Sequence, residues 1–233
     1  MKTSPLPKLT LPTYNITLPA SGKKVKYRPF IVREQKILLM SIESEDYSNV
    51  LEALKTIISE CTFGKIKVED LSIPDLSFLF INIRAKSVGE IVNPLLTCKK
   101  CKESNEVEID LTKIKMKTNK KHKKKIILEG DKGLIMKCPT IGMPNLTAKT
   151  TDTFSMISDC IEMIFDGDNV YKSEEYKKEE LVKFVEELST KQFEEVLDFF
   201  YTLPELTHEV LFECSKCKTK NKIKLEGLHD FFL

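Results

Sequence analysis

The sequence lacks long apolar runs and any marked excess of charge of one sign. No stretch approaches the about 18 consecutive apolar residues that cross a bilayer, so we expect no membrane-spanning segment and no membrane partner. The opening residues, MKTSPLPKLTLPTYNITLP, hold scattered prolines and no continuous apolar core, which argues against a signal peptide. The 37 basic and 35 acidic residues imply no bulk attraction to nucleic acid. The sequence thus predicts a cytosolic chain.

The common catalytic motifs are also missing. There is no phosphate-binding glycine loop, no dinucleotide fingerprint, no G-x-S-x-G and no H-E-x-x-H. The three histidines, His122, His208 and His229, stand in unrelated contexts. We therefore expect no enzymatic activity and no small-molecule substrate.

What the sequence does have is one short passage written twice. CKKCKESNEVEID begins at Cys98 and CSKCKTKNKIKLE begins at Cys214, with a constant offset of 116 positions. The offset also aligns Asn105 with Asn221, and Val107 and Ile109 with apolar residues of the second passage. Each passage therefore reads as a C-x-x-C turn followed by a strand in which apolar and polar residues alternate.

Two such turns can direct four sulfur atoms at the corners of a tetrahedron around one zinc ion. We therefore predict a split zinc ribbon with a structural zinc, in which no coordination position remains open for catalysis. The predicted ligands are Cys98, Cys101, Cys214 and Cys217. Neighbouring lysines would offset the negative charge of four thiolates. The other cysteines, Cys61, Cys138 and Cys160, stand in apolar surroundings typical of small core residues.

Two separate redox dithiols are the alternative interpretation of the cysteine pairs. A thioredoxin-like motif needs one active pair that opens a helix after a strand. Here both pairs precede strand patterns, which favours shared metal binding.

The predicted fold is α+β and divides into four parts. Residues 1–30 would form a proline-rich arm and a β-hairpin, in which Tyr14, Ile16 and Leu18 face Val25 and Tyr27. Residues 31–91 would form three helices, over 31–44, 46–61 and 72–89, with Asp46 or Ser48 capping the second and Pro74 near the start of the third. Residues 92–116 and 209–227 would form the ribbon, and residues 117–208 a mainly helical insert between its halves.

At the start of the insert the sequence predicts two short strands between Ile126 and Cys138, joined by a turn at EGDKG. Apolar residues at helical spacing then predict three helices, the first running through Phe154, Ile157, Ile161 and Ile164. The second carries Leu181, Phe184, Val185 and Leu188, and the third carries Phe193, Val196, Leu197 and Phe200, with Thr190 as a possible cap. The closing residues LEGLHDFFL suggest a docked tail.

Three stretches, KVKYRPF, TFG and RAKSVGE, are the most distinctive part of a likeness that runs in order along nearly the whole chain. Through them the chain resembles a known family, the T4-type phage baseplate hub proteins, in the group to which the gene 26 product of that phage belongs. The resemblance implies a protein of a contractile-tailed phage, made in the host bacterial cytoplasm, whose partners are other baseplate hub proteins. The residues leave open both a place in the tail baseplate of the virion and a role in assembly alone. No catalytic residues carry over.

A nucleic-acid-binding zinc-ribbon protein is the alternative function. It would use lysines near the metal and the run KTNKKHKKK at 117–125. That run is more typical of a solvated loop, since no aromatic residue is interleaved for base stacking. We also consider that the arm at residues 1–12 could add a strand to the sheet edge of a partner.

Overall fold

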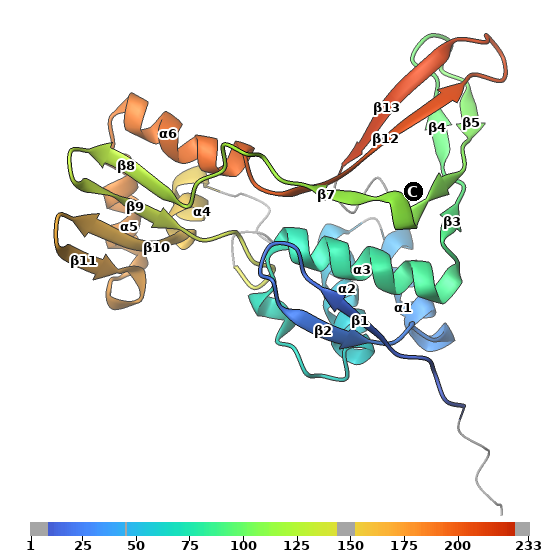
Figure 1. Cartoon of the computed structure of the whole chain (residues 1–233), viewed down its shortest axis with the longest axis horizontal. Coiled ribbons are helices and arrows are strands. Elements are labelled where there is room, and N and C mark those ends of the chain that lie inside the picture. The colour runs from blue at the N-terminus through green and yellow to red at the C-terminus, as the bar shows by residue number, and fades with distance from the viewer. Residues whose placement is uncertain (1–8, 45, 144–151, 227–233) are drawn as a thin grey trace, which may run out of the picture.

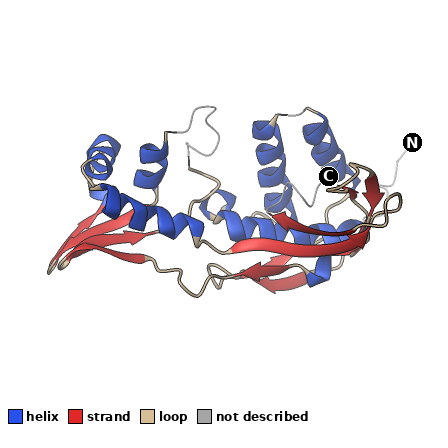
Figure 2. Cartoon of the chain, turned by 90° about the horizontal axis from the view of Figure 1, so that it is seen from above, coloured by secondary structure: helices blue, strands red, loops and turns tan. Residues whose placement is uncertain are grey.

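The computed structural model of the chain describes residues 9–44, 46–143 and 152–226. Within them the molecule is elongated, with helices along one long side and strands along the other (Figure 2). The N-terminal elements and the ribbon occupy one end, and the insert occupies the opposite end (Figure 1). Most of the predicted arm and the predicted C-terminal docked tail, residues 227–233, lie outside the described residues.

The N-terminal part is a hairpin packed on three helices. Its elements are β1 (Tyr14–Thr17), β2 (Lys24–Tyr27), α1 (Val32–Glu43), α2 (Tyr47–Cys61) and α3 (Ile73–Val88), with a 3₁₀ turn at Val68–Asp70. The hairpin has the predicted register, with Tyr14 opposite Tyr27 and Ile16 opposite Val25. The predicted helix boundaries hold to within two residues, and Asp46 caps α2 by accepting the N–H of Ser48 at 2.9 Å.

Helix α3 is buried on two sides because it separates two cores. One face contributes Leu76, Leu79, Phe80 and Ile83 to a core that also contains the hairpin and α2. Another face contributes Ile81 and Ala85 to the core of the ribbon. The helix thus joins the N-terminal part to the ribbon.

The ribbon is built from small antiparallel sheets. Its strands are β3 (Ile91–Val92), β4 (Leu95–Thr97), β5 (Ser104–Glu106), β6 (Ile109–Asp110), β7 (Lys115–Lys117), β12 (Glu205–Glu213) and β13 (Lys220–Glu226), with a 3₁₀ turn at Leu111–Lys113. The pairs are β3–β6, β4–β5 and the three-stranded order β13-β12-β7. The ribbon's two halves, far apart in sequence, lie side by side (Figure 1).

The insert is a four-stranded antiparallel sheet with three helices packed against it. Its elements are β8 (Lys125–Glu129), β9 (Lys132–Met136), α4 (Thr153–Asp159), β10 (Ile161–Asp166), β11 (Asn169–Lys172), α5 (Lys178–Glu186) and α6 (Thr190–Tyr201), with a 3₁₀ turn at Ser173–Glu175. The sheet order is β11-β10-β9-β8. Buried side chains from the sheet and from all three helices share one core.

Two details of the insert differ from the sequence prediction. The helix predicted through Phe154 to Ile164 ends at Asp159, because Ile161 onward pairs with β9 as a strand. The last helix is capped by Ser189 and not by Thr190, since Ser189 and Gln192 exchange backbone and side-chain hydrogen bonds.

The insert also contacts the N-terminal part directly. After β9 the chain returns to the start of α3, where the N–H of Ile73 donates to the carbonyl of Pro139 at 3.1 Å and the N–H of Ile141 donates to that of Leu71 at 3.2 Å. The side chain of Ile141 is only 1% exposed and belongs to the N-terminal core. Among the described residues, no helix has the length and apolar character that crossing a membrane requires.

Candidate metal centre

The four cysteines predicted to bind metal lie together at the tip of the ribbon. Cys98 and Cys101 stand in the turn between β4 and β5, and Cys214 and Cys217 in the turn between β12 and β13. All four sulfur atoms lie within 4.8 Å of one another, with 3.7 Å between those of Cys98 and Cys217 and 3.5 Å between those of Cys101 and Cys214. Sulfurs about 2.3 Å from a tetrahedral zinc ion are about 3.8 Å apart, so the cluster has the size such an ion needs.

The backbone of each turn is folded in the same way. In the first turn the N–H of Cys98 donates to the carbonyl of Glu103 at 2.8 Å, and the N–H of Lys102 donates to that of Cys98 at 3.0 Å. Lys102 takes a left-handed conformation with φ 62°, which is unusual for a residue other than glycine. The second turn repeats these features at the matching positions, Cys214, Thr219 and Lys218. The sequence repeat is therefore a structural repeat.

A buried asparagine from each half reaches across to the turn of the other half. The side-chain oxygen of Asn221 accepts the N–H of Lys99 at 3.0 Å. Its amide nitrogen lies 3.5 Å from the sulfur of Cys98. Asn221 is 4% exposed, so these contacts are shielded from water.

Asn105 makes the reciprocal contacts. Its oxygen accepts the N–H of Ser215 at 2.8 Å, and its amide nitrogen lies 3.8 Å from the sulfur of Cys214. The two asparagines therefore lock the turns together and direct N–H groups at sulfur, as residues around metal ligands commonly do. The repeated passage aligns Asn105 with Asn221, but their role was not predicted from the sequence. The sequence signal for this role was an asparagine at the same position of both passages, on strands in which apolar and charged residues otherwise alternate.

The protonation of the cluster favours a cation among the sulfurs. The hydrogen bond from the backbone N–H of Cys101 lowers the pKa of the Cys98 thiol to about 6, and the N–H of Lys100 and the amide of Asn221 act in the same direction. The N–H of Glu103 lowers the pKa of Cys101, but burial and the neighbouring sulfurs outweigh it and raise that pKa to about 12. Four sulfurs at this spacing cannot all ionise without a positive charge between them.

Two of the lysines beside the cysteines form contacts within the ribbon. Lys216 forms an ion pair with Glu103 at 2.9 Å, and this hydrogen bond raises the pKa of Lys216. The ammonium of Lys99 donates to the carbonyl of Lys222 at 2.8 Å. These contacts join the two halves at the surface, above the asparagines that join them inside.

The other candidate ligands stand apart from the cluster. Cys61 and Cys160 are fully buried, and burial raises the pKa of each thiol to about 12, while Cys138 is partly buried. Within the described part of the chain, the cysteine cluster is the one group of histidine, cysteine and acidic side chains with metal-binding spacing. His229 lies outside the described residues.

The lysine-rich run at 117–125 connects β7 to β8. His122 anchors it, because its ring lies 5.0 Å from that of Phe199 and its Nδ1 is 3.1 Å from the hydroxyl of Thr202. The lysines from Lys120 to Lys125 are exposed. This arrangement is that of a solvated loop held at one point.

One protein family matches the chain. The family, described as T4 bacteriophage base plate protein, matches residues 11–233, a range that includes the hairpin, the insert and both cysteine pairs. No curated protein and no solved structure matches the chain.

Proposed function

Because the chain belongs to the T4 bacteriophage base plate protein family, and is thus a phage baseplate structural protein, we propose that it acts in the central hub of the baseplate. It would bind other hub proteins of a contractile-tailed phage, be made in the host cytoplasm, and work either within the tail or during its assembly. The observation that carries this proposal is the family match along nearly the whole chain. The absence of common catalytic motifs from the sequence agrees with a binding role.

We propose further that Cys98, Cys101, Cys214 and Cys217 hold one structural zinc ion. Three features of the cluster support this: four sulfurs at tetrahedral spacing, two turns of identical backbone fold, and N–H groups directed at sulfur. Four thiolates fill the coordination sphere of zinc and leave no position for a substrate. The ion would hold together two halves of the ribbon that are far apart in the chain.

We also propose that the chain is organised into the four parts that the sequence predicts. The separate hydrophobic cores of the ribbon and the insert support the division of those two parts, while the hairpin and the helices of residues 31–91 share one core. Residues 117–208 would then be an insert that the ribbon carries.

Purification of the tagged full chain from infected cells, with elemental analysis of the same sample, tests both proposals. We expect baseplate hub proteins in the sample and about one zinc ion per chain. Cys214→Ser should lose the zinc, whereas Cys138→Ser, outside the cluster, should keep it. Recovery of the chain without other baseplate proteins would contradict the hub role, and equal zinc in both variants would contradict the site.

The alternative, binding of nucleic acid through the lysines, makes a different prediction for the same sample. Lysine–phosphate contacts release counterions, so such binding falls steeply as the salt concentration rises. Contacts built on apolar burial persist at salt concentrations that screen surface charges. We expect the chain's partners to stay bound through a high-salt wash and the sample to be free of nucleic acid.

A further inference from the structure

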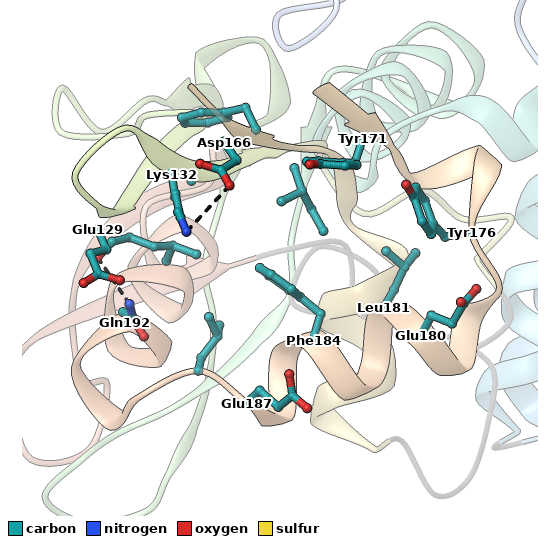
Figure 3. Close-up of a pocket in the computed structure, with 15 residues that line it drawn as sticks. Glu129, Lys132, Asp166, Tyr171, Tyr176, Glu180, Leu181, Phe184, Glu187 and Gln192 are labelled. Carbon is teal, nitrogen blue, oxygen red and sulfur yellow. Dashed lines mark hydrogen bonds and ion pairs between the residues drawn. The ribbon is translucent and has the colours of Figure 1, made fainter. Parts of the chain in front are cut away.

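The insert contains a cavity of about 650 Å³ between its sheet and helix α5, far from the cysteine cluster (Figures 1 and 3). Leu181 and Phe184 project into it from α5. Its apolar lining comes from both layers: Leu128 and Ile164 from the sheet, and Leu181, Phe184 and Leu188 from α5 and the residues after it. The cavity therefore offers a hydrophobic surface large enough for one or two aliphatic or aromatic side chains.

The sheet side of the cavity is formed by Leu128 and Ile164, whose side chains pack toward the helices. Phe165, the next residue after Ile164, points to the opposite face of the sheet, where its ring covers Gly133, its cross-strand partner. The ammonium of Lys125 lies 4.5 Å from the centroid of that ring.

The margin of the cavity is acidic. Four carboxylates, those of Glu129, Asp166, Glu180 and Glu187, lie around it with a single ammonium, that of Lys132 (Figure 3). Lys132 is 3.6 Å from Asp166 and pairs with that acid, and Lys183 pairs with Glu187 from outside the cavity, so two carboxylates, those of Glu129 and Glu180, remain in excess at the margin. Lys183 is 3.9 Å from Glu187, and both side chains are mostly exposed.

We propose that this cavity binds a short basic segment of another protein. An aliphatic or aromatic side chain of the segment would enter the apolar cavity, and lysines or arginines on either side of it would face the acidic margin. A buried anchor with charged neighbours is a common form of peptide recognition. The excess of carboxylates repels phosphates, which excludes nucleic acid as the occupant.

The proposal goes beyond the hub role and does not require it. It rests on residues of the insert alone, whereas the proposed zinc site lies in the ribbon. Peptide binding by the purified chain can therefore fail while co-purification with baseplate proteins succeeds, and the reverse is equally possible.

Fluorescence anisotropy with a dye-labelled peptide of sequence GKKLFKKG tests the proposal on the full chain. We expect binding that weakens at least tenfold for GEELFEEG, which reverses the charges, and for GKKSSKKG, which removes the apolar anchor. On the protein side, Glu129→Lys with Glu187→Lys should weaken binding of GKKLFKKG about tenfold. Both acids are exposed, and lysine near the end of α5 suits the helix dipole, so this variant should fold.

The matched control is Glu194→Lys with Glu195→Lys, which changes the charge equally on exposed positions of α6 outside the cavity. It should bind within twofold of the wild type. Should the first variant misfold by circular dichroism, Glu129→Gln with Glu187→Gln provides the same comparison with smaller charge changes. Failure of the wild-type chain to bind GKKLFKKG, equal binding of the three peptides, or equal weakening in both double variants would each overturn the proposal.

Discussion

A buried ion pair fastens the hairpin to the first helix. The two guanidinium nitrogens of Arg28 donate to the two carboxylate oxygens of Glu34 at 2.8 and 2.9 Å, and the N–H of Ile31 donates to the same carboxylate at 2.7 Å. The Glu34 side chain is 1% exposed. Burial raises the pKa of Glu34, but the bonds from Arg28 and Ile31 outweigh it and hold that pKa below its ordinary value. Arg28 belongs to the KVKYRPF stretch, so this bonding gives the stretch a structural purpose.

Replacing Glu34 with Gln should reduce the free energy of unfolding by about 3 kcal/mol at neutral pH, because the largely buried Arg28 then keeps, among the described residues, only the carboxylate of Glu60, 4.0 Å away, as a charged partner. Since the folded pKa is lowered, the contribution of Glu34 is complete above the unfolded pKa near 4.5 and is lost as the pH falls through the folded pKa. The advantage of the wild type over the variant should therefore begin to fall as the pH drops below about 4.5 and disappear below the folded pKa of Glu34. Urea unfolding at several pH values measures this. Glu43→Gln, on the exposed side of the same helix, should change stability by less than about 0.5 kcal/mol.

The asparagines behind the cysteine turns should control metal affinity. Asn105→Ala and Asn221→Ala each remove a contact to sulfur and a bond to the opposite turn while leaving all four thiols in place. We expect each to weaken zinc binding about 10- to 100-fold, the usual effect of losing a partner of the ligands. Competition with a coloured chelator measures the affinity. Asn119→Ala, in the lysine-rich loop, is the control, and equal affinity in all three variants would show that the asparagines do not act on the metal.

Helix α3 contributes to two cores, and its first turn also holds the hairpin. The carboxylate of Asp75 accepts the N–H groups of Ala20 and Ser21, in the turn between β1 and β2, at 2.7 and 3.0 Å. Asp75 is fully buried. The hairpin is therefore positioned by hydrogen bonds to one side chain as well as by its apolar face.

Asp75→Asn should loosen the hairpin, because an amide presents one acceptor and one donor where two acceptors are needed. We expect a loss of about 1–3 kcal/mol in stability and faster hydrogen exchange at the amides of Ala20 and Ser21. Asp70→Asn, whose side chain is exposed, serves as the comparison. If the two variants exchange alike at these amides, the carboxylate does not hold the turn.

The elements also show what the sequence could and could not predict. The hairpin, the first three helices and the clustering of four cysteines followed from alternation, caps and the repeated passage. The stretch from Phe154 to Ile164 was predicted wrongly because its isoleucines suit both a helix stripe and a buried strand, and pairing with β9 decides between them. The cavity in the insert was not predicted, since its lining combines β8, β10 and α5, which are separated in the sequence and meet only in the fold. Thiolate ligands suit several metals, so the cysteines predict a metal site without identifying the ion.

At the scale of the molecule, the described residues form three small cores: those of the N-terminal part and the ribbon lie on two faces of α3 at one end, and that of the insert lies at the other end (Figure 1). The ribbon core lies beside the cysteine cluster. It includes one face of α3, whose other face belongs to the core of the N-terminal part. Small cores of this kind commonly depend on a metal ion for part of their stability. The three parts should therefore respond differently when the ion is removed.

Chelation of the metal should unfold the ribbon before the N-terminal part and the insert. We expect hydrogen exchange, followed by mass spectrometry, to speed up in β12 and β13 while α2 and the insert sheet keep their protection. Cys101→Ser should show the same pattern without chelator. Simultaneous loss of protection in all three parts would mean that the chain unfolds as one cooperative unit, and no change anywhere would mean that the ribbon does not use a metal.

Among the described residues, the insert is joined to the remainder at two separate places. One is the neck where β7 pairs with β12, and the other is the contact of residues 139–141 with the start of α3. A body held by a single joint can swivel, whereas two spaced attachments resist rotation. A push or a twist on the insert would thus be passed to α3 as torque, and the protein would behave as a stiff lever under load.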